Sequence, residues 1–235
     1  MVFTDRHGGA SRAPYESANL ADHVGDRPDA VAANRRRVAT RLGLPPPDRW
    51  VEVRQVHGHD IVTADAPLPR VPDADAVVTR VTGLPLVIFT ADCAPIALVT
   101  DTAVAAVHAG WSGLEQGVVE RSVEALRRLA PGHVRAVLGP CIHAAHYEFG
   151  LDLLERLATR FGAGVVARTA AGAPALDIPA AVRAALRASG VDDLDDVDVC
   201  TASSADYFSY RRDGTTGRQA MLVVRGAARR GEDGP

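Results

Sequence analysis

Three residues in the first half of the chain, His57, Cys93 and His108, have side chains that bind soft metal ions. Each of these residues follows a short apolar segment and precedes residues typical of a turn. Gly58 comes directly after the first histidine, and Gly110 comes two residues after the second. Side chains at strand ends are held by a rigid scaffold, where sheet proteins commonly place chemistry. One thiolate and two imidazoles suit a transition metal, zinc above all, with a fourth position for water or substrate. The three residues are far apart in the sequence, so the prediction depends on their convergence in the fold.

The same residues also have simpler interpretations. A single histidine at a strand end is more often a hydrogen-bonded structural residue than a ligand, and a lone buried cysteine usually acts as a small apolar side chain. Cys141 and Cys200 fit that description, and we assign them no metal role. Cys93 differs because Asp92 precedes it and Pro95 follows, at an abrupt exit from an apolar segment. The residues alone leave a shared metal site and separate structural roles both open.

Length and composition limit the class of protein. The chain has 235 residues, of which 47% are hydrophobic and 23% charged, as in a soluble globular protein with a substantial core. The net charge of −3 argues against nucleic acid or an anionic membrane as the main partner. We expect no membrane span and no signal peptide. Three cysteines without a CxxC pair argue against a disulfide framework and favour the cytoplasm.

Apolar periodicity predicts a mixture of helices and strands. Residues 1–26 read as a loop region, and helices are expected over 28–42, 114–129, 150–161 and 177–189. Strands are expected over 50–56, 73–79, three apolar runs between 86 and 107, 134–138, 197–200 and 221–225. Because strands and helices do not alternate regularly, we predict a mixed-sheet α/β layered domain rather than a doubly wound parallel sheet. We place this single domain at 1–230 and a disordered tail at 231–235.

A series of short motifs runs in order along almost the whole chain and carries a family resemblance. The motifs are FTDRHGG (3–9), HVGD (23–26), NR (34–35), QVHG (55–58), DADAVVT (73–79), ADCAP (91–95), VHAGW (107–111), GPCI (139–142), YE (147–148) and FSYRRDG (208–214). No single motif is decisive, but their number and order are highly specific. The chain resembles the bacterial laccase-domain family, also called YfiH-like or polyphenol oxidase-like, whose members are now mostly described as purine nucleoside phosphorylases.

The resemblance implies a layered αββα sandwich with mixed β-sheets and a zinc ion held by His57, Cys93 and His108. It implies phosphorolysis of adenosine, inosine and methylthioadenosine, together with adenosine deamination. The partners would be nucleoside and phosphate, and the protein would be a monomer or homodimer. Arg35, in the NR motif, is implied to contact substrate or phosphate. One departure matters: the family usually has arginine where this chain has Ser112, which puts its phosphate affinity in question.

Each implied reaction makes its own demands on the side chains. Deamination needs a metal site that activates water for attack on the purine C6, and a carboxylate that carries a proton to the departing amine. We rank Asp92 ahead of Asp75 as that proton shuttle, although strand neighbours point to opposite faces unless the turn begins at Asp92. Phosphorolysis needs cations for the phosphate, and Arg35, Arg6 and Arg212 are available.

Three other functions stay open. Cys93 could be the nucleophile of a hydrolase with a histidine as its base, which would suit editing of peptidoglycan precursors. Copper-dependent polyphenol oxidation follows from the older family name, but multicopper oxidation needs more histidines than a two-histidine, one-cysteine set; copper therefore ranks behind zinc. A non-catalytic zinc-stabilised binding module is the third, and structural zinc usually has four protein ligands.

Overall fold

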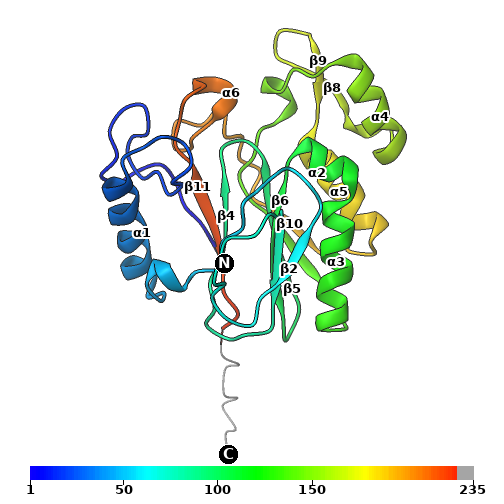
Figure 1. Ribbon diagram of the computed structural model, residues 1–235. Helices are drawn as coiled ribbons and strands as arrows, with labels where there is room; N and C mark the ends of the chain where they lie inside the picture. The colour runs from blue at the N-terminus through cyan, green and yellow to red at the C-terminus, as the bar shows by residue number, and fades with distance from the viewer. Residues whose placement is uncertain (227–235) are drawn as a thin grey trace, which may run out of the picture.

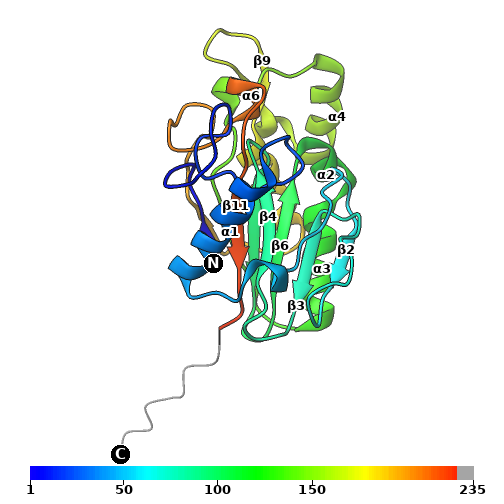
Figure 2. The same ribbon diagram turned by 60° about the vertical axis from the view of Figure 1, so that its left-hand side comes forward.

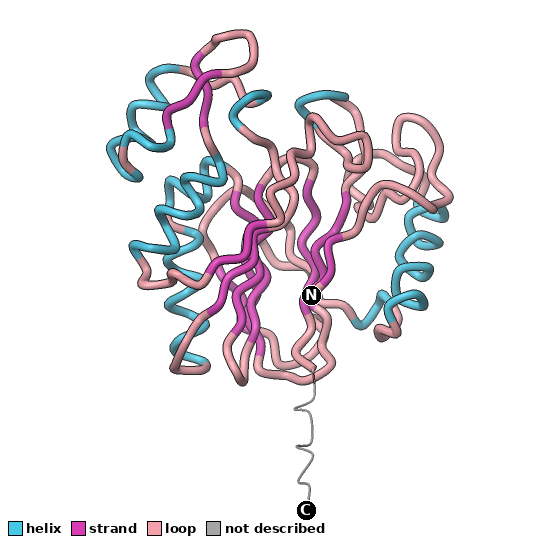
Figure 3. Tube along the Cα trace, turned by 180° about the vertical axis from the view of Figure 1, so that it is seen from behind, coloured by secondary structure: helices cyan, strands magenta, loops and turns pink. Residues whose placement is uncertain are grey.

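The protein forms four layers, seen edge-on in Figure 1 and from behind in Figure 3. In this computed structural model, which describes residues 1–226, α1 covers a three-stranded sheet, and that sheet packs on a six-stranded sheet. Helices α2, α3 and α5 cover the far face of the second sheet. The predicted mixed α/β layered fold is therefore confirmed, while the tail expected at 231–235 lies outside the described residues. No helix within 1–226 is long and apolar enough to cross a membrane.

The larger sheet is mixed, as expected, and the smaller sheet is antiparallel. The three-stranded sheet has the order β1-β11-β4 and is antiparallel, with bounds Val2–Phe3, Gln219–Val223 and Leu86–Thr90. The six-stranded sheet has the order β10-β7-β5-β6-β3-β2, with bounds Leu194–Asp196, Arg135–Leu138, Ala94–Val99, Val104–Ala109, Ala76–Thr79 and Ile61–Thr63. Its pairs β10–β7 and β2–β3 are parallel and the others antiparallel. A separate hairpin pairs β8 with β9, over Val166–Arg168 and Pro174–Leu176.

The helices include three close to the positions expected from the sequence. Their bounds are α1 Pro28–Leu42, α2 Trp111–Gln116, α3 Val118–Leu129, α4 Leu151–Phe161, α5 Ile178–Ala188 and α6 Tyr210–Asp213. Three short 3-10 turns are η1 Pro47–Arg49, η2 Ala144–His146 and η3 Ala163–Val165. In Figures 1 and 2, α6, α2 and the hairpin with α4 all lie toward one end of the two sheets.

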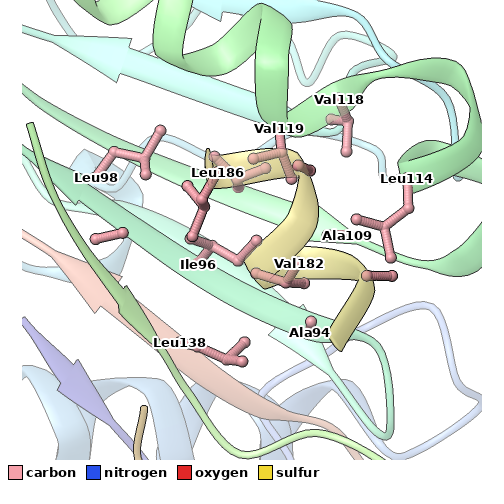
Figure 4. Close-up of a cluster of buried hydrophobic side chains, with 14 of the residues drawn as sticks. Ala94, Ile96, Leu98, Ala109, Leu114, Val118, Val119, Leu138, Val182 and Leu186 are labelled. Carbon is pink, nitrogen blue, oxygen red and sulfur yellow. The ribbon is translucent and has the colours of Figure 1, made fainter. Parts of the chain in front are cut away.

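Strand alternation decides which side chains lie between the sheets. In β4, Ile88 points to the other sheet and Val87 to the α1 side. In β6, Ala106 points between the sheets, whereas Ala105 packs with the helices in the core that Figure 4 shows. By the same alternation, His108 shares the face of Ala106. The second histidine is therefore directed into the space between the two sheets.

Three predicted elements differ from the structure. Segment 50–56 is no continuous strand, since it contributes only isolated bridges at Val51 and Arg54. The single helix expected over 114–129 is two helices, because Gly117 between them has a φ of 89°, which a right-handed helix cannot contain. The strand expected over 197–200 lies earlier, as β10, and Cys200 keeps one bridge.

Candidate metal centre

The structure brings the three predicted ligands together. The ligand atoms of His57, Cys93 and His108 all lie within 4.8 Å of one another, and Cys93 Sγ is 3.7 Å from His57 Nε2. A tetrahedral zinc ion at ordinary bond lengths separates a sulfur and a nitrogen ligand by about 3.6 Å. The cluster therefore has the donor types and the spacing for one such ion. Whether it holds a metal, and which one, stays a prediction.

Each ligand comes from a different chain segment. His108 is the second-last residue of β6 and is 3% exposed. Cys93 is half-buried in the short turn between β4 and β5, and Pro95 of β5 pairs with His108. His57 is exposed, and its φ of 58° makes a sharp turn that directs its ring toward the other two ligands.

One buried carboxylate connects both histidines. Asp75 is fully buried, and its Oδ1 accepts hydrogen bonds from His108 Nδ1 at 2.7 Å and from the His57 amide at 3.0 Å. Its Oδ2 accepts from the Gly58 amide at 2.7 Å. Burial alone would raise the pKa of Asp75, but these hydrogen bonds, above all that from His108, lower it. Since an ionised carboxylate only accepts, His108 carries its proton on Nδ1 and offers Nε2 as the ligand atom.

Gly110 is required by the close approach of two ligands. A Cβ at this position would lie 2.8 Å from Cδ2 of His57 and 3.2 Å from Sγ of Cys93. Both distances are shorter than ordinary carbon contacts, and neither ligand could retreat without leaving the cluster. The glycine that follows β6 is therefore part of the architecture of the site.

The charges in the cluster favour a thiolate beside an imidazolium when no metal is bound. Burial alone would raise the pKa of the Cys93 thiol, but the charge of His108 and hydrogen bonds from His108 and His57 lower it to about 6. Burial opposes the charge on His108, whereas the charge of Cys93 and the hydrogen bond to Asp75 raise its pKa to about 9. A thiolate is both a metal ligand and a nucleophile, so the cluster is prepared for either use.

Asp92, the predicted proton shuttle, adjoins the cluster but is engaged elsewhere. Its φ of 109° turns the chain out of β4 immediately before Cys93. Thr201 Oγ1 donates to its Oδ1 at 2.6 Å, and the amide of Arg211 donates to its Oδ2 at 2.7 Å. The carboxylate thus ties the cysteine turn to α6. Its part in proton transfer stays a prediction.

Arg35, the predicted substrate contact, does not contact the cluster. Its Nη1 donates to Glu52 at 2.9 Å and its Nε to the carbonyl of Leu20 at 2.7 Å. It lines a cavity of about 620 Å³ that also includes Trp50 and Arg70, and none of the three metal ligands lines that cavity. A role of Arg35 in phosphorolysis stays a prediction. It would require substrate or phosphate to bind in this cavity.

The two other cations named from the sequence are occupied by protein partners. Arg6 donates to the carbonyl of Glu16 and lies 3.8 Å from Asp213. Arg212 binds Asp213 and also donates to backbone carbonyls between Thr201 and Tyr207. Both arginines serve the local structure around α6.

Three aromatic side chains pack together near the cluster, and of these only Trp111 is suggested by the sequence as an apolar wall for a flat substrate. The ring of Phe149 lies 5.6 Å from that of Trp111 and 5.4 Å from that of Tyr147. Trp111 directly follows Gly110, which approaches both His57 and Cys93, so this wall adjoins the cluster. Burial raises the pKa of Tyr147, and the charge of Cys93 adds to that effect. The guanidinium of Arg211 lies 4.7 Å from the centre of the Tyr147 ring. Such flat surfaces stack well on aromatic heterocycles.

Comparison with known proteins identifies the family. A family model described as multi-copper polyphenol oxidoreductase laccase matches residues 1–226. The chain belongs to this family. The resemblance to laccase-domain, YfiH-like proteins is thereby confirmed, and it now extends over all the described residues of the chain.

Relatives of this laccase-domain protein cover nearly its full length. A protein of Streptomyces coelicolor named purine nucleoside phosphorylase is 46% identical over 227 residues, which are 94% of this chain and 93% of the relative. Purine nucleoside phosphorylase YfiH of Shigella flexneri is 37% identical, over 93% of this chain and 90% of the relative.

Solved structures of family members have the same fold. A Neisseria meningitidis protein matches with a TM-score of 0.87 and 37% identity, over 96% of this chain and 93% of its own. YlmD from Geobacillus stearothermophilus matches with a TM-score of 0.86 and 32% identity, over 96% of this chain and 91% of its own.

Proposed function

We propose that the protein is a metal-dependent purine nucleoside phosphorylase that acts on adenosine, inosine and methylthioadenosine and also deaminates adenosine. The observation that carries the proposal is the convergence of His57, Cys93 and His108 around one point, with Asp75 behind both histidines. The relatives named purine nucleoside phosphorylase support the reaction class. The proposed metal is zinc, the partners are nucleoside and phosphate, and the proposed location is the cytoplasm.

Phosphorolysis exchanges one bond at the ribose for another. An oxygen of phosphate bonds to C1′ while the bond from C1′ to the purine N9 breaks, and the bonding electrons leave with the base. The base takes up, through solvent, the proton that phosphate loses as it becomes the ester, and ribose 1-phosphate is the other product. The chain must therefore hold an anion beside C1′ and a flat heterocycle next to it. The wall formed by Trp111, Phe149 and Tyr147 offers a surface on which the heterocycle can stack.

Deamination replaces the amine on the purine C6 by oxygen from water, and ammonia leaves. A zinc ion bound by the cluster would supply Lewis acidity that makes water reactive near neutral pH. Asp75 keeps the Nε2 lone pair of His108 available for such an ion. We propose that Asp92 carries the proton to the departing amine, for which one of its two present hydrogen bonds would have to open.

A cysteine hydrolase is the second candidate function. The lowered pKa of Cys93 and the His57 ring at 3.7 Å favour it, because they are what a nucleophile and its base require. The two functions differ in what protects the sulfur. The test is alkylation of Cys93 by iodoacetamide. Protection of Cys93 by zinc but not by substrate would favour the metal site, whereas protection by substrate but not by zinc would favour the hydrolase. Copper polyphenol oxidation ranks last, because residues 1–226 contain no second cluster of three such ligands.

The proposal is tested with purified protein whose metal content is measured alongside. Adenosine is supplied with and without phosphate, and products are separated by liquid chromatography. We expect adenine and ribose 1-phosphate only when phosphate is present, and inosine in both conditions. A protein with stoichiometric zinc that forms none of these products would contradict the proposal.

A further inference from the structure

One arginine at the metal-site end of the sheets differs from its neighbours. Arg6, Arg35 and Arg212 each form an ion pair with a carboxylate. Arg211 and Arg218 form no ion pair with any carboxylate of residues 1–226. Arg211 is exposed and donates to the carbonyl of Glu148, whereas Arg218 is half-buried. The guanidinium carbon of Arg218 lies 5.9 Å from the centre of the Tyr210 ring. This neutral ring does not balance the positive charge of the guanidinium.

The backbone of Arg218 is fixed in place. Its amide donates to Oδ1 of Asn19 at 2.9 Å, and its carbonyl accepts from the amide of Leu20 at 3.0 Å. The guanidinium Nη1 donates to the carbonyls of Thr216 and Gly217 at 2.9 and 3.0 Å. These hydrogen bonds fix the backbone of Arg218 and the Nη1 group of its side chain, and they therefore fix the orientation of the guanidinium.

Strand pairing places Arg218 near the metal ligands. It immediately precedes β11, whose first residue, Gln219, pairs with Thr90 at the end of β4. Continuing that antiparallel register by one step sets Arg218 opposite Ala91, two residues before Cys93. In Figures 1 and 2 this end of β4 and β11 lies beneath α6, at the same end of the sheets as α2.

The electrostatic surroundings agree with this placement. Burial lowers the pKa of Arg218, and the negative charges of Cys93 and Asp92 oppose that effect. His23 lies within reach as well, since burial and the charge of Arg218 both lower its pKa. Arginine stays charged at any ordinary pH, so this is a partly desolvated cation that forms no direct ion pair among residues 1–226. Such a group is stabilised when a ligand supplies the negative charge.

We propose that Arg218 is the binding residue for the inorganic phosphate that attacks the nucleoside. This inference rests on the proposed phosphorylase function and assigns the anion site that function requires. The Nε and Nη2 groups of Arg218 have no protein partner within residues 1–226, and they form the edge of the guanidinium that binds two oxygens of one phosphate side by side. None of the three cations named from the sequence keeps such an edge free of an ion pair.

The test compares the phosphate dependence of three variants with that of the wild-type protein. Arg218→Gln removes the charge and the two-donor edge, and Arg218→Lys keeps only the charge. Arg187→Gln, at an exposed position on α5, is the matched control. For Arg218→Gln we expect the KM for phosphate to rise on the order of tenfold to a hundredfold, with a smaller rise for Arg218→Lys. Phosphate-independent deamination should stay within about twofold of wild type, which also reports that the variants are folded.

An unchanged KM for phosphate in Arg218→Gln would overturn the inference. A calorimetric titration of the protein with orthophosphate alone distinguishes failure of the Arg218 assignment from failure of the proposed phosphorylase function. If the wild-type protein binds orthophosphate and Arg218→Gln does not, the anion site is supported even where no nucleoside is cleaved, and the phosphorylase proposal alone fails. Equal binding by both proteins overturns the assignment of Arg218.

Discussion

Asp75 Oδ1 and His108 Nδ1 lie 2.7 Å apart, in a part of the protein from which solvent is excluded. The same carboxylate accepts hydrogen bonds from the amides of His57 and Gly58, and its backbone carbonyl accepts from the amide of His108. A single side chain therefore sets the ring orientation of one proposed ligand and the backbone turn of another. Outer hydrogen bonds of this kind fix the tautomer and the direction of a ligating histidine.

Replacement of this carboxylate should weaken metal binding. Asp75→Asn keeps the size of the side chain but presents an amide donor to groups that already donate. We expect zinc affinity to fall by about tenfold to a hundredfold, as measured by competition with a chromogenic chelator. Asp73→Asn is the matched control, because Asp73 is exposed and pairs with Arg54 at the surface. Equal zinc affinities for Asp75→Asn and wild type would show that the hydrogen bond does not support a metal site.

A methyl group at position 110 should disturb the cluster directly. In Gly110→Ala the added Cβ would lie 2.8 Å from the His57 ring and 3.2 Å from the Cys93 sulfur, so one ligand must move away. We expect lower metal occupancy after dialysis, with little change in the far-ultraviolet circular dichroism. Gly164→Ala is the control, since a Cβ there meets no atom within 4 Å. Full occupancy in Gly110→Ala would mean that the three ligands need not converge as closely as they do here.

The reactivity of Cys93 in metal-free protein should depend on pH in a defined direction. The pKa of its thiol is lowered to about 6, so the thiolate predominates above that pH and is protonated below it. We expect the rate of alkylation at Cys93, followed by mass spectrometry of its peptide, to rise through about pH 6 and then level off. His108→Gln removes the main source of the shift and should move the midpoint upward. A wild-type midpoint near that of an ordinary thiol, about 8.5, would contradict this electrostatic description.

The layers could be predicted from the sequence because they leave local patterns. The residues alone left the three proposed ligands open, and it was the family resemblance that favoured them. Apolar runs of strand length precede Cys93 and His108, and the period of two along β6 already directs His108 away from the helices. The role of Asp75 was not predictable, because it depends on contacts with residues 18 and 33 positions away that only the fold creates. The spacing of carboxylates along the chain cannot distinguish such a supporting residue from a proton shuttle.

Two further features of the structure could not be predicted from the sequence pattern. The apolar face over 114–129 continues through Gly117, so its periodicity conceals the break that the backbone of that glycine makes. Arg218 has no local signal of its own, since it follows a glycine in a polar stretch. Its lack of an ion pair depends on the fold, which brings the nearby carboxylates to other arginines.

Removal of Arg35 should separate its structural contribution from its predicted catalytic one. Arg35 and Glu52 are only 13% and 17% exposed, and burial raises the pKa of Glu52 while Arg35 lowers it. Arg35→Ala leaves that carboxylate without its partner, so we expect the free energy of unfolding to fall by about 2 kcal/mol in urea titrations. Phosphorolysis should fall more than deamination, measured below the unfolding transition. An equal loss of both activities would assign Arg35 a structural role only.

The measurement that tests the metal site most directly is the zinc content and turnover of Cys93→Ala, with Cys200→Ala as the control for loss of a free thiol. The wild-type protein and Cys200→Ala should hold about one zinc ion per chain, whereas Cys93→Ala should hold none and lose both phosphorolysis and deamination. A Cys93→Ala protein that is free of metal yet turns over adenosine at the wild-type rate would contradict the proposed function.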